Sequence, residues 1–451
     1  MSTVSQAKKG LPGLSASIKD KLIQQALERK LRQAGQEQET RSMSGPAAQR
    51  SAIPEEYYRF ELHPGYRQLR ILNEGAARMG VRSPFFKLHE ATASAATRIG
   101  GKPYINYASY NYLGMSGDPV VAQAAKDAID RYGTSVSASR LVSGERPIHR
   151  ELERALAEVY EVEDAVTFVS GHATNVSTIG YLFGPRDLVL HDELIHNSVL
   201  QGIQLSGARR LPFAHNDWAA LDAILQDQRH QFERVLIVLE GIYSMDGDFP
   251  DLPRFVEIKR RHKAFLMVDE AHSLGVMGKR GYGIREHFGL AGKDVDIWMG
   301  TLSKTLAGCG GYIAGEAALV EHLKFLAPGF LYSVGMPPSV AAASLAALRR
   351  MQELPERVAT LQARGRYFLE LTQAAGIDTG GSAGFAVVPA ITASSLRAAR
   401  LSAALFERGI NVQPILYPAV PEKSARLRFF VSCQHTEEDL RNTVAALRAA
   451  L

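Results

Sequence analysis

Apolar and polar positions alternate in a regular way from Asn106 to about Gly335. Short apolar runs, each typical of a buried strand, are separated by longer segments in which apolar residues recur at helical spacing. This alternation predicts a mostly parallel sheet that is covered by helices on both faces. The expected strands are 165–169, 187–190, 234–239, 265–269, 296–299 and 312–314, and the clearest helices between them are 148–160, 218–228 and 252–262.

The pattern changes on either side of this α/β region. From Met336 to Leu451, long helices rich in Ala, Leu and Arg are followed by a late strand at 426–432, which predicts a smaller α+β domain. Residues 97–107 read as a short hairpin around Gly100 and Gly101. Residues 51–105 therefore form an expected N-terminal arm, 106–335 a large domain and 336–451 a small C-terminal domain.

Residues 1–50 differ in character from the rest of the chain. Apolar residues recur near helical spacing over 14–34 with Lys and Arg between them, and 35–50 is a polar segment typical of a linker. A basic amphipathic helix of this kind is suited to a membrane surface, an acidic partner or another part of the same protein. The alternative is a solvated extension.

The composition indicates a globular protein and excludes little else. Of 451 residues, 46% are hydrophobic and 22% are charged, and no apolar run approaches the roughly 18 residues of a membrane-spanning helix. The N-terminus lacks the apolar segment of a signal peptide, and the two cysteines have no metal or disulfide spacing, so we expect a cytoplasmic protein. The net charge of +5 is weak support for a nucleic-acid binder, and nothing in the core favours one.

A lysine in a glycine-rich turn is the first sign of chemistry. Residues 296–303 form an apolar run that ends in small residues, then Lys304, and Gly308 and Gly310 follow. Such a lysine can contact a phosphate or form a Schiff base with a carbonyl cofactor. A nucleotide P-loop would have its glycines before the lysine, so this order argues against one.

A second apolar run, at 264–268, ends in Asp269 and is followed by His272. In open α/β sheets, ligands bind at the carboxyl ends of the strands. There an Asp can hold a pyridine nitrogen protonated, and a His can reach the phenolic oxygen of the same ring. Together with Lys304 as the imine-forming amine, these residues match the needs of pyridoxal phosphate. An isolated D-E-A-H would otherwise be a loop acid and a structural histidine.

With these motifs on view, the chain resembles the α-oxoamine synthase family of fold-type-I pyridoxal phosphate enzymes, from about Asn106 to the C-terminus. That family includes serine palmitoyltransferase, 8-amino-7-oxononanoate synthase, 5-aminolevulinate synthase and 2-amino-3-ketobutyrate CoA ligase. The resemblance implies a large domain with a seven-stranded, mostly parallel sheet and a smaller α+β domain. It rests on motifs in family order at residues 109–114, 133–135, 143–144, 170–175, 191–192, 196–198, 215–217, 240–248, 264–273, 296–305 and 425–428.

The resemblance implies roles for the residues around the cofactor ring. Lys304 would attach the cofactor covalently and later move the substrate proton. Asp269 would pair with the pyridinium nitrogen, and His272 would bond the phenolic oxygen. His196 matches the family histidine that stacks on the ring face.

It also implies a phosphate site. The turn at 170–175 would offer backbone N–H groups at a helix start, with Gly171 followed by His172 where many relatives have another aromatic residue. Thr301 and Ser303 would add hydroxyl groups, and Ser244 lies near the cofactor in relatives.

In the family, the partner subunit of a homodimer supplies a hydroxyl pair to the same phosphate. Here Ser333 is retained, but Val334 and Gly335 occupy the neighbouring positions, which would leave this clamp one donor fewer. The resemblance thus implies a homodimer with shared active sites.

For the amino-acid substrate, Arg428 matches the family arginine that binds the carboxylate, a task suited to a bidentate guanidinium. Arg426 is the competing candidate. Tyr110 stands where some relatives have Asn, Asn111 follows it, and His196 faces the same pocket. This pattern resembles serine palmitoyltransferase more than the ligase.

The implied reaction is a pyridoxal-phosphate-dependent decarboxylative Claisen condensation of glycine, alanine or serine with an acyl thioester. The N-terminal arrangement resembles members that work beside polyketide synthases, which implies an acyl carrier protein as a partner in place of free coenzyme A. Two alternatives stay open: another pyridoxal reaction such as aminotransfer, and a non-catalytic partner subunit. We expect no nucleic acid, no metal and no transmembrane segment.

Overall fold

The computed structural model describes residues 53–78 and 83–451. They belong to two compact units, one ending at Phe85 and one running from Phe86 to Leu451. The described part of the first unit holds η1 (Glu55–Tyr57), η2 (Phe60–Leu62) and α2 (Pro64–Arg78). The helix expected over residues 14–34 and the linker after it lie outside the described residues.

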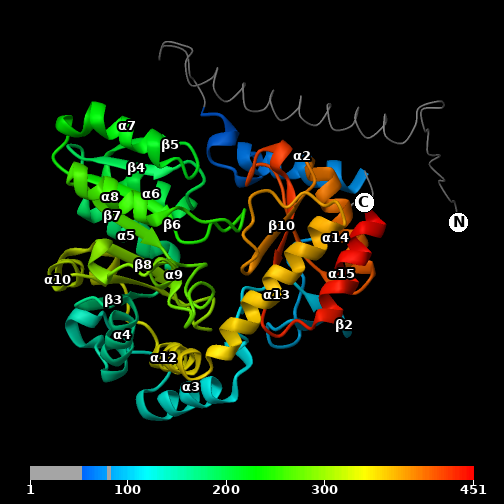
Figure 1. The fold of residues 1–451 in the computed structure, drawn as a ribbon, viewed down its shortest axis with the longest axis horizontal. Coiled ribbons are helices and arrows are strands. Elements are labelled where there is room, and N and C mark those ends of the chain that lie inside the picture. Colours follow the sequence, from blue (N-terminus) through cyan, green and yellow to red (C-terminus); the bar gives the residue numbers. More distant parts are fainter. Residues whose placement is uncertain (1–52, 79–82) are drawn as a thin grey trace, which may run out of the picture. The chain divides into compact units, whose positions relative to one another are not determined.

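A mixed sheet forms the centre of the second unit (Figure 1). In the described chain it has seven strands in the order β3-β9-β8-β7-β6-β4-β5, and every neighbouring pair is parallel except the two that involve β9. The carboxyl ends of β4, β6, β7 and β8 therefore meet at one edge. The strands are β3 (Asp164–Phe168), β4 (Leu188–Asp192), β5 (Arg209–Phe213), β6 (Val235–Glu240), β7 (Phe265–Asp269), β8 (Ile297–Thr301) and β9 (Gly311–Gly315).

Both faces of this sheet are buried, as the continuous apolar runs predict. Within β6, Ile237 and Leu239 pack into one core cluster, whereas Leu236 and Val238 pack into the other. The second cluster includes α5 (Gly171–Leu182), α6 (Asn197–Ser206), α10 (Ala317–Leu326) and α11 (Pro328–Leu331). The first includes α3 (Pro119–Tyr132), α4 (Pro147–Tyr160), α7 (Trp218–Gln228), α8 (Leu252–His262), α9 (Gly283–Phe288) and α12 (Pro338–Glu353).

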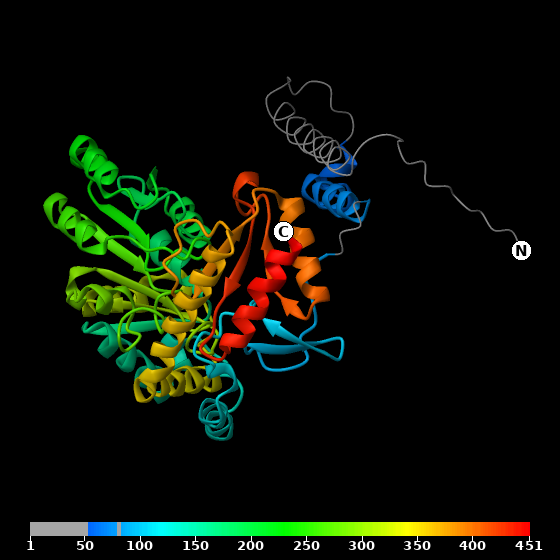
Figure 2. The same cartoon turned by 45° about the vertical axis from the view of Figure 1, so that its right-hand side comes forward.

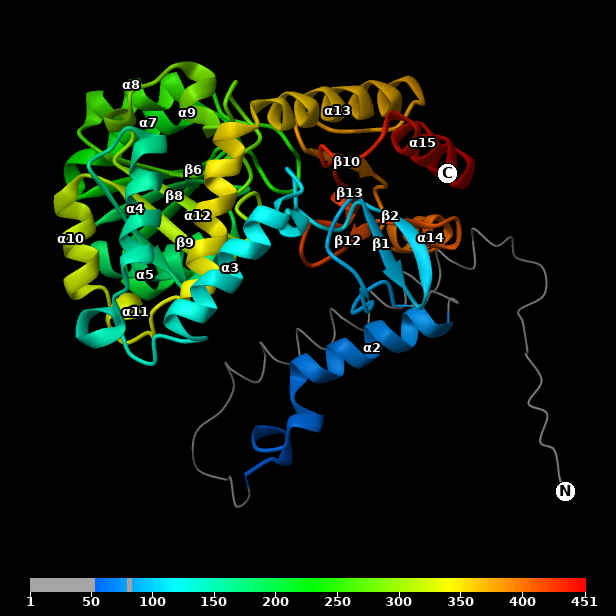
Figure 3. The ribbon, with the colours of Figure 1, turned by 90° about the horizontal axis from the view of Figure 1, so that it is seen from below.

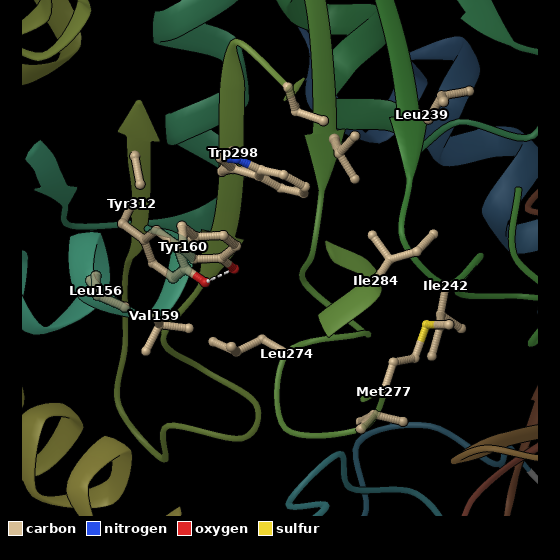
Figure 4. Packing of buried hydrophobic residues seen from close by; sticks show 14 of the residues in the cluster. Leu156, Val159, Tyr160, Leu239, Ile242, Leu274, Met277, Ile284, Trp298 and Tyr312 are labelled. Carbon is tan, nitrogen blue, oxygen red and sulfur yellow. Dashed lines mark hydrogen bonds between the residues drawn. The ribbon is translucent and has the colours of Figure 1, made fainter. Parts of the chain in front are cut away.

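Buried aromatic residues fix the strand that leads to Lys304 (Figure 4). Trp298 of β8 stacks on Tyr160 with 5.3 Å between the ring centroids, and its Nε1 donates to the carbonyl of Gly292 at 2.8 Å. The hydroxyls of Tyr160 and Tyr312 lie 2.7 Å apart. All three side chains are fully buried, so β8 has little freedom to shift.

Two smaller, three-stranded sheets complete the second unit (Figures 2 and 3). One is antiparallel, with the order β10-β13-β12, and the other joins the hairpin β1–β2 to β11, with Ile410 beside Ile105. Their strands are β1 (Ala96–Ile99), β2 (Lys102–Asn106), β10 (Val387–Ile391), β11 (Ile410–Asn411), β12 (Gln413–Ile415) and β13 (Arg426–Phe430). The helices packed with them are α13 (Pro355–Ala374), α14 (Ser395–Glu407) and α15 (Glu437–Ala450).

Short helical turns connect these elements. They are η3 (Met115–Gly117), the π-helical turn η4 (Arg140–Gly144), η5 (Arg229–Gln231), η6 (Gly292–Asp294) and η7 (Glu422–Ser424).

The expected α/β architecture is confirmed, including the seven-stranded, mostly parallel sheet and the hairpin. Gly100 and Gly101 form the hairpin turn at φ values of 57° and 73°, which favour glycine. The pattern analysis missed β5, an edge strand whose Arg209, Arg210 and Pro212 hide the apolar alternation. Within the described residues, no helix is both long enough and apolar enough to span a membrane.

Candidate active site

Polar side chains gather where four neighbouring strands end. The register of the sheet places Glu240 of β6 beside Asp269 of β7, and Asp269 beside Met299 of β8. The parallel order of these strands brings their carboxyl ends together, which is where ligands bind in open α/β sheets. The strands end at Asp192, Glu240, Asp269 and Thr301.

Lys304 lies in the turn that follows β8. Its Nζ is 5.8 Å from the ring centroid of Tyr110. Burial lowers the pKa of Lys304 from 10.5 to about 8, although the charges of Asp269 and Glu240 oppose the shift. A substantial fraction of the amine is therefore neutral near physiological pH, as a nucleophile or a base requires.

Asp269 is held by a chain of hydrogen bonds that reaches His196. Asn175 Nδ2 donates to Asp269 Oδ2 and to Ser198 Oγ, each at 2.9 Å, and the amide of Ala271 donates to Asp269 Oδ1 at 3.0 Å. Ser198 Oγ lies 2.7 Å from His196 Nδ1. This chain fixes the carboxylate and the exposed imidazole relative to each other.

His272 is buried against Tyr112 and Phe430. The Tyr112 hydroxyl lies 2.7 Å from His272 Nδ1, and the ring of Phe430 is nearly parallel to the imidazole at 6.0 Å. Burial holds the pKa of His272 well below its usual value and raises that of Tyr112, so both groups are neutral. With Tyr112 donating to Nδ1, the ring proton sits on Nε2, which is then a donor.

The start of α5 meets the hydroxyls that follow β8. Ser170 caps the helix, and a Cβ placed on Gly171 would lie only 2.8 Å from Thr301 Oγ1. Thr301 Oγ1 and Ser303 Oγ are 2.8 Å apart. Unpaired backbone N–H groups of a first helical turn, beside two hydroxyls, suit a phosphate, and His172 stands exposed in that turn.

Two arginines of β13 meet the loop at 241–249 in different ways. Arg426 Nη1 binds Asp246 Oδ1 at 2.5 Å and the carbonyl of Met245 at 2.9 Å. Arg428 is bound only to the carbonyl of Ser244 at 3.1 Å and to the sulfur of Met245 at 3.2 Å. Among the described residues Arg428 has no carboxylate partner, so its guanidinium is the one free to bind an added carboxylate.

Tyr110 and Asn111 are adjacent in the sequence but lie in different surroundings. Tyr110 packs edge-on against Phe430 with 5.5 Å between ring centroids and faces Lys304. Asn111 is buried, its Nδ2 donates to the carbonyl of Ala93 at 2.6 Å and its Oδ1 accepts the amide of Ser116 at 3.2 Å. We expected Asn111 to bind the substrate. Its side chain instead binds the protein backbone, so its contacts stabilise the fold.

The sequence predicts that Ser333 and Ser244 lie at the cofactor, but neither side chain has a described contact with the other candidate residues. Ser333 is half-buried, its Oγ donates to the carbonyl of Val334 at 3.3 Å, and none of its described contacts is with the other candidate residues. Ser244 is buried, but its known contacts use its backbone: its amide donates to Glu240 Oε2 at 3.2 Å and its carbonyl binds Arg428.

Sequence analysis missed Tyr112, Asn175, Ser198 and Glu240. All four stand inside motifs at 109–114, 170–175, 196–198 and 240–248. Glu240 ends an apolar run and could have been found in the same way as Asp269. The other three do not end such a run, so the sequence gives no sign of their partners. Glu240 is fully enclosed, and burial together with the charge of Asp269 raises its pKa to about 8. Its Oε1 has no hydrogen-bond partner among the described residues.

These donors fit pyridoxal phosphate. The site offers an amine with a lowered pKa, a fixed buried carboxylate, a neutral imidazole donor and a helix start beside hydroxyls, which match the four parts of that cofactor. Within the described residues no cluster of side chains suited to a metal ion is found.

Comparisons agree with this assignment. Residues 102–447 match the model of the aminotransferase class I and II family. The 8-amino-7-oxononanoate synthase of Symbiobacterium thermophilum is 42% identical over 77% of this chain and 88% of its own, and that of Geobacter sulfurreducens is 42% identical over 80% and 92%. A serine palmitoyltransferase from S. paucimobilis, solved with bound PLP, superposes with a TM-score of 0.82 at 30% identity, over 86% of this chain and 97% of that one.

The chain is thus a fold-type-I pyridoxal-phosphate-dependent transferase. More narrowly, it belongs to the α-oxoamine synthases, acyltransferases that condense an amino acid with an acyl thioester and release CO2.

Proposed function

We propose that this enzyme condenses glycine, alanine or serine with an acyl thioester to give an α-amino ketone, CO2 and the free thiol. The observation that carries the proposal concerns Arg428. Among the described residues its guanidinium has no acid partner, and its charge contributes, after burial, to lowering the pKa of Lys304 and of His272. A buried cation of this kind needs an anionic partner, and the carboxylate of an amino acid supplies one.

Pyridoxal phosphate, when bound, supplies an electron sink for the negative charge that develops at Cα of the amino acid. Lys304 would hold the cofactor and, as a neutral amine, would accept the Cα proton of the amino acid. Asp269 would keep the ring nitrogen protonated, and His272 would donate from Nε2 to the phenolic oxygen. His196 would stack on the ring.

The phosphate is held by the start of α5 and by Thr301 and Ser303, with Gly171 allowing the close approach of the backbone. Arg428 would bind the carboxylate of the amino acid, and Lys304 would be the base for its Cα proton. Contacts at two points would restrict the orientation of the amino acid in the site.

The aromatic side chains around the carboxylate site favour a small amino acid. Phe430 lies under the guanidinium of Arg428 at 4.5 Å, and Tyr110 packs against Phe430 beside Lys304. A small amino acid would keep its side chain clear of these two rings.

The test is the visible absorption spectrum of the purified protein during separate titrations with glycine, L-alanine and L-serine. We expect a yellow protein whose band shifts with one of the three, and release of CO2 and thiol when an acyl thioester is then added. A protein that stays colourless with added pyridoxal phosphate overturns the role of Lys304. A pyridoxamine product without CO2 identifies aminotransfer instead.

We propose further that the enzyme is a homodimer in which Ser333 contributes to the phosphate site of the partner subunit. The segment that carries Ser333 supports this, because Tyr332 is 87% exposed and Val334 is 51% exposed, which suits a subunit interface. Light scattering at micromolar concentration tests the mass, and a monomer overturns the shared site.

An acyl carrier protein is our proposed acyl donor, on the resemblance of the N-terminal arrangement to synthases that act beside polyketide synthases. The comparison of kcat/KM for the same acyl group on coenzyme A and on a carrier protein tests it. Equal values, or a preference for coenzyme A, overturn this proposal and leave the condensation itself untouched.

A further inference from the structure

A histidine outside the candidate active site joins two of its loops. His215 follows β5 and lies between two carboxylates: its Nδ1 is 2.8 Å from Asp192 Oδ1, and its Nε2 is 2.7 Å from Asp248 Oδ2. Burial alone would lower the pKa of His215, but its hydrogen bonds to Asp192 and Asp248 raise it to about 10. At neutral pH the ring is therefore a cation that donates from both nitrogens.

The first carboxylate organises the turn that leads to His196. Asp192, which is fully buried, accepts the amide of Leu194 at its Oδ1 at 2.9 Å, and its carbonyl accepts the amide of Ile195 at 3.1 Å. His196 follows directly and starts α6. The other Asp192 oxygen accepts the amide of Asn216 at 2.8 Å, which ties this turn to the residue beside His215.

Asp248, which carries the second carboxylate, closes the loop on which Arg428 rests through its backbone carbonyl. The amide of Tyr243 donates to the carbonyl of Asp248 at 2.9 Å, and the amide of Gly247 donates to the carbonyl of Tyr243 at 2.8 Å. The ring of Tyr243 also meets that of His215 edge-on at 4.5 Å. Between these points, Ser244 and Met245 present the two atoms that Arg428 contacts.

We propose that His215 is a positioning residue that holds the Ser244–Met245 segment in place, so that Arg428 directs its free donors at the carboxylate of the amino acid. The inference rests on the proposed function of Arg428. Removal of the positive ring leaves Asp192 and Asp248 facing each other without a cation, and like charges at that range repel. The loop would then move, and Arg428 would lose its two contacts.

The experiment is a double-mutant cycle on the enzyme loaded with its cofactor. Variants His215→Gln, Arg428→Lys and the double variant are compared by the dissociation constant of the amino acid, read from the shift of the cofactor band. We expect His215→Gln to weaken binding about tenfold in the natural background and less than about twofold in the Arg428→Lys background. His230→Gln, at an exposed position, is the matched control and should leave the constant unchanged.

Equal weakening by His215→Gln in both backgrounds means that the residue does not act through Arg428, and it overturns the inference. Unchanged binding by His215→Gln in the natural background also overturns the inference. Where His215→Gln does not fold, Asp248→Asn takes its place, because it keeps the shape of the side chain and replaces the charge-assisted bond to His215 Nε2 with a weaker, neutral one. We expect a smaller weakening of amino-acid binding, which is again lost in the Arg428→Lys background. A natural enzyme whose spectrum responds to none of the three amino acids refutes the proposed function, which is a distinguishable result.

Discussion

The two walls of the candidate active site are built in opposite ways. On the wall formed by the strand ends, Asp269 and His272 already have protein partners: Asn175 holds Asp269, and Tyr112 holds His272. On the wall formed by β13, the guanidinium of Arg428 lies over the ring of Phe430, and its hydrogen bonds among the described residues go to a carbonyl and a sulfur. The groups of the first wall are oriented before any ligand binds, whereas the guanidinium of the second wall is available to bind the ligand.

This difference matches the two tasks of the site. A cofactor that stays bound through every turnover benefits from groups that are already oriented. A substrate that enters and leaves needs an unsatisfied partner, since a guanidinium already paired with a carboxylate would gain little from a second one. Arg426 shows the contrast within one strand, because its bond to Asp246 leaves it no such role.

The largest effect is expected on the wall formed by the strand ends, which is called the cofactor wall below. Lys304→Ala removes the amine that attaches the cofactor and moves the Cα proton, so condensation should fall by at least about a thousandfold. Because the residue lies in a turn, the protein should remain folded, which the circular dichroism spectrum and the thermal midpoint check. Turnover of more than a few per cent of the natural rate would contradict the assignment.

The next effect separates the two arginines. Arg428→Lys keeps the charge but loses the bidentate geometry, so the KM of the amino acid should rise by about 10- to 100-fold with a smaller change in kcat. Arg426→Lys should mainly lower the thermal midpoint, because Arg426 joins β13 to Asp246 and Met245. Steady-state kinetics and thermal unfolding of both variants show whether the roles are divided in this way; a larger KM change for Arg426→Lys would reverse the assignment.

A third prediction uses the pH at which Lys304 becomes reactive in the cofactor-free protein. Covalent attachment needs the neutral amine, and burial lowers the pKa of Lys304 to about 8. The rate of attachment should therefore rise about tenfold per pH unit below 8 and level off above it. Nα-acetyllysine, with an ordinary pKa, is the control whose rate should still be rising at pH 9. If the rate for the protein also keeps rising at pH 9, Lys304 has the ordinary pKa of an amine in water, and the prediction is wrong.

Much of the cofactor wall could be read from the sequence because its residues end apolar runs. Lys304 and Asp269 each follow a buried strand, and parallel strands bring their ends together without any knowledge of packing. The groups that hold them could not be read in this way. Asn175 is 94 residues from Asp269, and Tyr112 is 160 residues from His272, so only the fold reveals those pairs.

The choice between the two arginines of β13 was left open by the sequence for a related reason. Arg426 and Arg428 are two residues apart on one strand and carry the same charge, so pattern alone cannot rank them. The loop at 241–249 decides between them by supplying Asp246 to one and only Ser244 and Met245 to the other. Asn111 was misassigned because its neighbour, Tyr110, faces the site while its own amide is used by Ala93 and Ser116.

The smallest effect predicted tests whether the cofactor wall is set in advance. Tyr112→Phe leaves His272 Nδ1 without its donor, so the ring can take the other tautomer and lose its Nε2 proton. We expect the dissociation constant of pyridoxal phosphate to rise about three- to tenfold, and the free energy of unfolding to fall by about 1 kcal/mol.

Tyr107→Phe is the matched control, since it removes a buried hydroxyl that bonds Thr443 at 2.9 Å, away from His272. It should lower stability similarly and leave cofactor binding unchanged. Equal cofactor affinity in the two variants would mean that His272 keeps its orientation without Tyr112, and that the arrangement of this wall depends on packing against Phe430 instead.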